Sequence, residues 1–257
     1  IIFVFFAAAL LVKAKSFADI VKISIPAAIH VLILIAEKDL GGALIFYITY
    51  IVILYVATRK ERYILLGAGA LAAGSVAAYK LFYHVRVRVA AWKDPWSDVA
   101  NKGYQVTQSL FAIGTGGWFG MGLCEGTPQK IPVSKTDFIF SAICEEMGVF
   151  FGLCIILVEI SCFVMFINIS LKINSRFYKL TALGLSVEYM FQVFLTIGGV
   201  TKFIPSTGVT LPLISYGGSS VTSTMILFAI IQGLYVKNSG RGEISETDEK
   251  KHGRRRE

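Results

Sequence analysis

Apolar residues occur in seven runs along the chain, separated by shorter polar segments. The runs cover approximately residues 1–12, 23–36, 40–57, 63–82, 147–169, 180–200 and 216–236. A helix that crosses a membrane needs about 20 mostly apolar residues, and most of these runs approach that length. The pattern therefore predicts an all-α, polytopic transmembrane bundle of about seven spans within residues 1–236.

The first two runs are shorter than the others. The run 1–12 starts at Ile1, with no basic segment or cleavage site before it, so we interpret it as a span whose beginning precedes this sequence. Pro26 lies near the start of the second run. We expect it in the first helical turn, where a proline removes no intrahelical hydrogen bond.

The composition agrees with a membrane protein. Apolar residues make up 55% of the chain and charged residues 16%, whereas about a quarter of the residues in a soluble domain are charged. The net charge of +8 could indicate a nucleic-acid partner. However, seven of the 25 Lys and Arg residues lie in the last 21 residues and most others flank the apolar runs, so we expect no nucleic-acid partner.

The cysteines indicate no metal site or disulfide framework. They form no CxxC pair and no cluster with histidine, and we interpret them as small apolar fillers: Cys124, Cys144, Cys154 and Cys162.

Lysine and arginine predict which side each connection faces. One set of short connections carries nine positive residues, Lys13, Lys15, Lys22, Arg59, Lys60, Arg62, Lys172, Arg176 and Lys179, while the alternate short connections carry only Lys38 and Lys202. The positive-inside rule places the first set in the cytoplasm, together with a basic, disordered tail at 237–257. An anionic-lipid or partner role for the tail is an alternative. Residues 83–140 then form one large extracytoplasmic loop, and loops of that length usually have a function.

Asp137 lies where this outer loop meets the next apolar run. A carboxylate at the membrane edge is poorly solvated unless it has a partner. From its position alone, Asp137 is either a helix cap, together with Thr136, or a general base with a raised pKa that serves a lipid-linked substrate. The position does not choose between the two.

Other polar residues at membrane depth have two interpretations as well. Lys38, Asp39, Glu145, Glu146 and Lys202 lie on the predicted outer side, where a polar site shared with Asp137 is at least as plausible as packing. We expect interhelical hydrogen bonds for the deeper residues Glu159, Glu188 and Gln192.

The segment 202–220, KFIPSTGVTLPLISYGGSS, interrupts the helical pattern with prolines and glycines. Irregular backbone at that depth persists only inside protein or beside a watery cavity. The stretch from Tyr216 to Ser220 could present backbone N–H groups to an anion at the start of the last helix. Close helix packing at the glycine pair is the alternative.

Taken together, these residues resemble the SEDS (shape, elongation, division and sporulation) family of FtsW-, RodA- and SpoVE-like proteins. The matching segments, in family order, are EKDLGGALI (37–45), WKDPWSDVANKGYQVTQSLFAIGTGGWFGMGL (92–123), KTDFIFSAICEEMG (135–148), and Gln192 followed by GVTKFIPSTGVTLPLISYGGSS (199–220). The sequence departs from the family at Lys38, where a proline is usual, and at PVSK before TDF. It also lacks the family's upstream QPSE-type segment and N-terminal spans.

The resemblance implies a peptidoglycan glycosyltransferase that polymerises lipid II at the outer face of the bacterial cytoplasmic membrane. It implies a class B penicillin-binding protein and other division or elongation membrane proteins as partners. The Asp of the family's TDF segment corresponds to Asp137, the expected catalytic base. We expect no protein metal ligands, although a divalent cation, Mg²⁺ or Mn²⁺, is an alternative to protein cations at the leaving pyrophosphate.

Substrate binding is expected from polar residues on the predicted outer side. The candidates are Lys202, Arg88, Lys38, Asp39, Gln105, Gln108, Glu145, Glu146, Ser215, Tyr216, Gly217, Gly218 and Ser219. Two other functions stay open, a lipid II flippase and a non-catalytic scaffold for a penicillin-binding protein, because a polar cavity within a multi-span bundle also suits transport.

Overall fold

The computed structural model describes the backbone of residues 1–14 and 16–253, and the side chains of these residues as far as Asn238. Helices and turns make up this part of the chain, and the described residues form no strand. The helices are α1 (Ile2–Lys13), α2 (Phe17–Ala36), α3 (Leu40–Thr58), α4 (Arg62–Leu81), α5 (Tyr83–Lys93), η1 (Pro95–Asp98), α6 (Tyr104–Gly116), η2 (Pro128–Lys130), α7 (Ile139–Lys172), α8 (Arg176–Val200) and α9 (Gly218–Gly253).

Six of these helices are long and apolar enough to cross a membrane, namely α2, α3, α4, α7, α8 and α9, and α1 is a shorter apolar helix. The all-α bundle predicted from the apolar runs is confirmed. Helix α8 lies at the centre, because 61% of its most apolar window is buried, compared with 6% for α2 and for α4.

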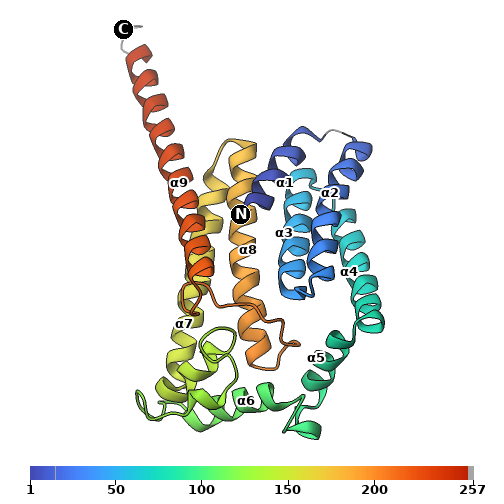
Figure 1. The fold of residues 1–257 in the computed structure, drawn as a ribbon. Coiled ribbons are helices and arrows are strands. Elements are labelled where there is room, and N and C mark those ends of the chain that lie inside the picture. Colours follow the sequence, from blue (N-terminus) through green and yellow to red (C-terminus); the bar gives the residue numbers. More distant parts are fainter. Residues whose placement is uncertain (15, 254–257) are drawn as a thin grey trace.

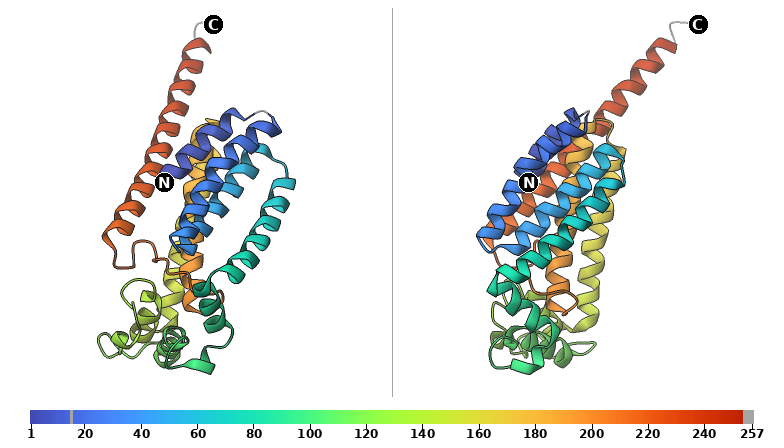
Figure 2. Two further views of the ribbon diagram at one scale, coloured as in Figure 1. Left: turned by 45° about the vertical axis from the view of Figure 1, so that its right-hand side comes forward. Right: turned by 90° about the vertical axis from the view of Figure 1, so that its right-hand side faces the viewer.

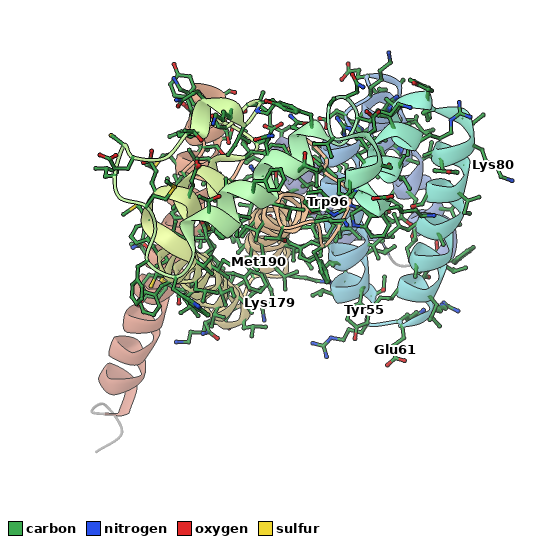
Figure 3. The ribbon with its side chains drawn as sticks, turned by 90° about the horizontal axis from the view of Figure 1, so that it is seen from below. Tyr55, Glu61, Lys80, Trp96, Lys179 and Met190 are labelled. Carbon is green, nitrogen blue, oxygen red and sulfur yellow. The ribbon has the colours of Figure 1, made fainter. Side chains whose placement is uncertain are left out.

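The bundle has two unlike ends (Figure 1). Helices α5 and α6 and the connections around them form a layer across one end, which we call the loop layer (residues 82–138). The far end of α9 projects from the opposite end, and the two side views show the same separation (Figure 2). Seen from the loop end, Trp96 lies in this layer (Figure 3), where its ring packs 5.5 Å from that of Phe111 on α6.

Two predicted helix starts were wrong. Helix α2 starts at Phe17 instead of 23, because Ser16 and Asp19 form a capping box of reciprocal side chain to backbone hydrogen bonds (2.9 and 3.2 Å). Pro26 therefore lies inside the helix and not in its first turn. Helix α7 starts at Ile139 instead of 147, so Glu145 and Glu146 are helical residues.

Helix α7 contains a break at Gly148, whose φ of 85° and ψ of 164° are not helical. The break frees backbone groups on both sides, and the segment 117–122 of the loop layer binds them. The amides of Met121 and Gly122 donate to the carbonyls of Glu145 and Glu146 (3.0 Å each). In return, the amides after the break donate to the carbonyls of Gly117 and Trp118 (2.9 and 3.2 Å). This exchange fastens the loop layer to the start of the span.

The predicted hydrogen bonds between spans are present for Glu159, which accepts from the Tyr189 hydroxyl on α8. Gln192 instead donates to the carbonyl of Thr210 (2.9 Å), in the segment that follows α8. The sequence predicts disorder for the tail 237–257, whereas α9 continues through it to Gly253. That stretch contains no proline and several glutamates and lysines, which favour a helix.

Candidate functional site

Asp137 lies in the last turn before α7, at the end of the loop layer in the sequence, and is half-buried. The N-cap residue of α7 is Phe138, and no side chain forms a capping hydrogen bond there. Of the two interpretations of Asp137, the helix cap is therefore wrong. Its carboxylate therefore does not cap α7.

The carboxylate of Asp137 and the guanidinium of Arg88 meet at Gly208. A Cβ atom added to Gly208 would lie 3.5 Å from Asp137 Oδ2 and 3.7 Å from Arg88 Nη2. The φ of Gly208 is +77°, which favours glycine. Three segments far apart in the sequence thus converge, from α5, from the turn before α7 and from the connection between α8 and α9.

Burial raises the pKa of Asp137 above its ordinary value, while the Thr136 hydroxyl and the positive charge of Arg88 act against this increase. A general base works best when its pKa is near the pH at which the enzyme acts, and the raised pKa of a buried carboxylate is closer to neutral pH. The arrangement also keeps a cation beside the carboxylate without a close ion pair, since none of the ion pairs between described residues joins them.

Ser215 holds the backbone next to Asp137 in place. Its buried hydroxyl donates to the carbonyl of Thr136 (2.6 Å) and accepts from the amide of Leu211 (2.7 Å). The amide of Tyr216 also donates to the carbonyl of Lys135 (2.8 Å). The Ser215 hydroxyl thus positions the backbone beside Asp137, and its predicted substrate contact stays a prediction.

The connection between α8 and α9 is fixed by further contacts. Arg88 Nη1 donates to the carbonyl of Thr207 (3.1 Å), and Trp92 Nε1 donates to the carbonyl of Lys202 (3.1 Å). Both donors come from α5. Lys202 thus lies close to the site through its backbone, while the role of its ammonium group stays a prediction.

The start of α3 packs against the same connection. Asp39 caps α3 by accepting from the amide of Gly42 (2.8 Å), and the neighbouring Lys38 is exposed. Gly41 lies so close to Val209 and Thr207 that a Cβ atom would collide with the valine side chain. The segment DLGG therefore brings the positive end of a helix dipole near the Arg88 and Asp137 pair.

Glu145 and Glu146 face a different part of the loop layer. Glu145 is buried and accepts from the Thr127 hydroxyl (3.3 Å), while its Oε2 has no hydrogen-bond partner among the described residues. Both side chains pack under Gly126. The structure does not bring them together with Asp137, because they contact the segment 120–127 instead.

No hydrogen bond between described residues joins the other predicted binding residues to Asp137. Gln105 and Gln108 are half-buried on α6, and the stretch Tyr216, Gly217, Gly218 and Ser219 is largely exposed at the start of α9. Their substrate contacts stay predictions. Sequence reasoning missed Thr207 and Gly208, whose roles depend on a turn that no local motif reveals.

An apolar groove of about 520 Å³ runs from Arg88 into the membrane region. Residues of α2, α3, α4, α5 and α8 and of the segment 204–207 form its walls. Among the described residues that line it, Arg88 is the one that carries a charge. The groove therefore joins an apolar channel to a cationic end beside Asp137.

The site does not fit a metal ion held by the protein alone. Among the described residues, no three His, Cys, Asp or Glu side chains are grouped to bind one, and a guanidinium stands beside the single carboxylate. Divalent cations usually bind several oxygen ligands. No chemical step is therefore assigned to a metal, and a divalent cation stays a prediction.

The fold and this site define a multi-pass membrane protein with an acid and a cation at the loop end of an apolar groove. The profile of the FtsW/RodA/SpoVE family, described as "Cell cycle protein", matches residues 1–240. The chain therefore belongs to the FtsW/RodA/SpoVE family.

Individual relatives agree with this family. The chain is 41% identical over 203 residues to the peptidoglycan glycosyltransferase RodA of Mycobacterium tuberculosis, covering 79% of this chain and 43% of that protein. It is 34% identical over 203 residues to the stage V sporulation protein E of Bacillus subtilis, covering 78% of this chain and 55% of that protein. The chain thus spans about half the length of these curated relatives.

A solved structure has the same fold. It belongs to a study of a peptidoglycan synthase complex that coordinates polymerization and crosslinking, and it matches with a TM-score of 0.74 and 26% identity. The match covers 91% of this chain and 66% of the solved one.

Proposed function

We propose that this chain carries the catalytic region of a peptidoglycan glycosyltransferase that polymerises lipid II at the outer face of the bacterial cytoplasmic membrane. The observation that carries the proposal is the placement of Asp137 and Arg88 at the end of an apolar groove. The three parts of a lipid-linked sugar need three features in the same order. The sugar hydroxyl needs a base, the pyrophosphate needs a cation, and the polyprenyl tail needs an apolar channel.

In the proposed reaction, Asp137 accepts the proton from an attacking sugar hydroxyl. The hydroxyl oxygen forms a bond to the anomeric carbon of the second sugar, and the bond from that carbon to the polyprenyl pyrophosphate breaks. The leaving pyrophosphate carries the bonding electron pair. Arg88 stabilises that developing negative charge, while the groove between α2, α3 and α4 holds part of the polyprenyl chain.

We also propose that the chain works with a class B penicillin-binding protein and with other membrane proteins of division or elongation. The likeness to a component of a peptidoglycan synthase complex supports such a partner. With the loop layer outside the cell and the tail of α9 in the cytoplasm, the site faces the compartment in which glycan strands are assembled.

The substitution Asp137→Asn tests the catalytic role. Asparagine keeps the size of the side chain but cannot accept a proton near neutral pH, so turnover is expected to fall by roughly a hundredfold or more. The protein is expressed from its complete reading frame together with its penicillin-binding partner, and lipid II polymer is resolved on a gel. Partner co-purification is the folding control, and Asp98→Asn, a partly exposed acid on η1, is the matched variant.

Near-normal polymer from Asp137→Asn would remove this residue from the mechanism. Transbilayer movement of lipid II without any polymer from the unmodified protein would instead assign a flippase. Partner binding alone, without polymer or transport, would assign a scaffold.

A further inference from the structure

Helices α7 and α9 enclose a second groove, distant from Asp137. It lies near the end of the bundle opposite the loop layer, where the two helices run side by side (Figure 1). Its volume is about 640 Å³, within the range of roughly 300–1,000 Å³ typical of ligand pockets. The lining residues are Ile160, Ser161, Val164, Met165, Asn168, Ile169, Lys172, Gln232 and Tyr235.

The polarity of this groove changes with depth. Ser161, Asn168 and Lys172 lie on one face of α7, because they are seven and four residues apart. Lys172 is at the end of the helix, and Asn168 lies one turn deeper, about 6 Å along the axis. Ser161 lies deeper still, and its hydroxyl is already bonded to the carbonyl of Leu157 (2.7 Å).

The polar residues of α9 that face the groove also lie nearer its outer end than its apolar walls. Asn238 is level with the end of α7, since its amide donates to the carbonyl of Lys172 (3.1 Å). Gln232 lies six residues before Asn238, about 9 Å deeper. An ammonium group therefore marks the end of the groove, two amides follow one to two turns below it, and apolar walls continue inward.

These polar groups have no partners within the described part of the chain. The side chains of Asn168 and Gln232 are exposed and form no hydrogen bond with described residues, and no described carboxylate pairs with Lys172. Amides that face lipid are costly unless something satisfies them. The groove is therefore complementary to a ligand that has a negative charge at one end, acceptor oxygens next to that charge and an apolar tail.

We propose that the α7/α9 groove binds an anionic phospholipid of the leaflet opposite the loop layer. The phosphate lies at Lys172, the ester oxygens accept from Asn168 and Gln232, and an acyl chain lies along Ile160 and Val164. A transmembrane helix of a partner fits less well. Its polar contacts would be spread along the whole groove, whereas those of α7 and α9 are concentrated near one end.

The test uses the protein in phosphatidylcholine nanodiscs with a photoactivatable phosphatidylglycerol, or with the matching phosphatidylcholine probe. Mass spectrometry then maps the labelled peptides. The phosphatidylglycerol probe is expected to label residues 160–172 and 232–235 more strongly than the phosphatidylcholine probe. The substitution Lys172→Gln should lower this labelling roughly fivefold, the contribution of one lysine at an anionic surface.

Lys60→Gln is the matched control. Lys60 is an exposed lysine at the same end of the bundle, where Arg176 ties the start of α8 to the carbonyl of Ala57 (2.7 Å). Its loss removes the same charge and should leave the labelling unchanged. The double variant Asn168→Leu with Gln232→Leu, both at exposed positions, should also lower the labelling and tests the amides separately.

Equal labelling by the two probes, or equal effects of Lys172→Gln and Lys60→Gln, would overturn the proposal. A crosslink from the groove to a partner's transmembrane helix, with loss of labelling by both lipids, would overturn it in favour of a protein interface.

Discussion

At the scale of single residues, the carboxyl group of Asp137 is subject to two opposing influences. Its burial disfavours the charged form, whereas the guanidinium of Arg88 favours it, and burial is the larger effect. Arg88 therefore has two roles in the proposed reaction. It stabilises the leaving pyrophosphate, and it keeps Asp137 ionised at a lower pH than burial alone would allow.

The substitution Arg88→Gln separates these roles through the pH profile. A base must be deprotonated to act, so activity rises as the pH passes upward through the pKa of Asp137. Removing the cation raises that pKa further, and the acidic limb of the profile should move to higher pH. The measurement is the initial rate of lipid II polymerisation across pH, normalised for each variant.

Arg86→Gln is the control for this experiment. Arg86 lies on the same helix, α5, where its guanidinium packs over the ring of Tyr83 at 5.9 Å. Its loss should leave the acidic limb in place. A limb that does not move in Arg88→Gln would show that the charge of Arg88 does not reach Asp137.

At the scale of secondary-structure elements, the break in α7 joins the loop layer to the membrane spans. Gly148 has a backbone conformation that is essentially restricted to glycine, and a Cβ atom there would collide with the Trp118 carbonyl. The four hydrogen bonds between the segment 117–122 and α7 depend on this close approach.

The substitution Gly148→Ala should therefore destabilise the loop layer. The backbone strain alone costs about 1–3 kcal/mol, and the collision adds to it. The expected result is a lower midpoint of thermal unfolding and faster proteolysis within residues 117–127, with reduced polymerisation. Thermal unfolding in detergent and limited proteolysis are the measurements.

Gly114→Ala provides the comparison, because Gly114 is an exposed helical glycine of α6 with no neighbour within 4 Å of an added Cβ atom. Alanine there should be neutral or stabilising by roughly 0.5–1 kcal/mol. Similar unfolding midpoints for the two variants would contradict the role assigned to the break.

Most helices could be predicted from the sequence, because a membrane-length apolar run indicates a transmembrane helix through its hydrophobicity alone. The errors lie at the helix starts, because local hydrogen bonds determine the residue at which a helix begins. The capping box at Ser16 starts α2 early, and the loop layer stabilises α7 ahead of its apolar run. Hydrophobicity carries no information about either effect.

The site was predicted less completely. The sequence predicts both Asp137 and Arg88 as site residues, because an acid and a cation are visible as residue types. Two features of the site depend on segments about 70 to 120 positions apart in the sequence. The first is the approach of Asp137 and Arg88 to Gly208, and the second is the hydrogen bond from Ser215 to the backbone of Thr136. Contacts over such distances cannot be derived from one sequence by periodicity or spacing.

At the scale of the whole molecule, we expect the two ends of the bundle to lie on opposite sides of the membrane. The loop layer is at one end, and α9 leaves from the other (Figure 1). The positive residues of the short connections predict which end faces the cytoplasm, because nine of them belong to the connections at the end from which α9 leaves and two to those at the other end.

Single cysteines at Ser97 and Ser239 test the direction, in a background without the four native cysteines. Ser97 is exposed on η1 in the loop layer, and position 239 follows the described side chains of α9. An impermeant thiol reagent added to intact cells should label the cysteine at position 97. The cysteine at position 239 should react only after the membrane is permeabilised.

Two outcomes would contradict this prediction. Labelling of position 239 alone in intact cells would show that the orientation is the reverse, with Asp137 in the cytoplasm, away from the growing glycan strand. Labelling of both positions in intact cells would contradict the opposition of the two ends itself, and with it the arrangement of the bundle.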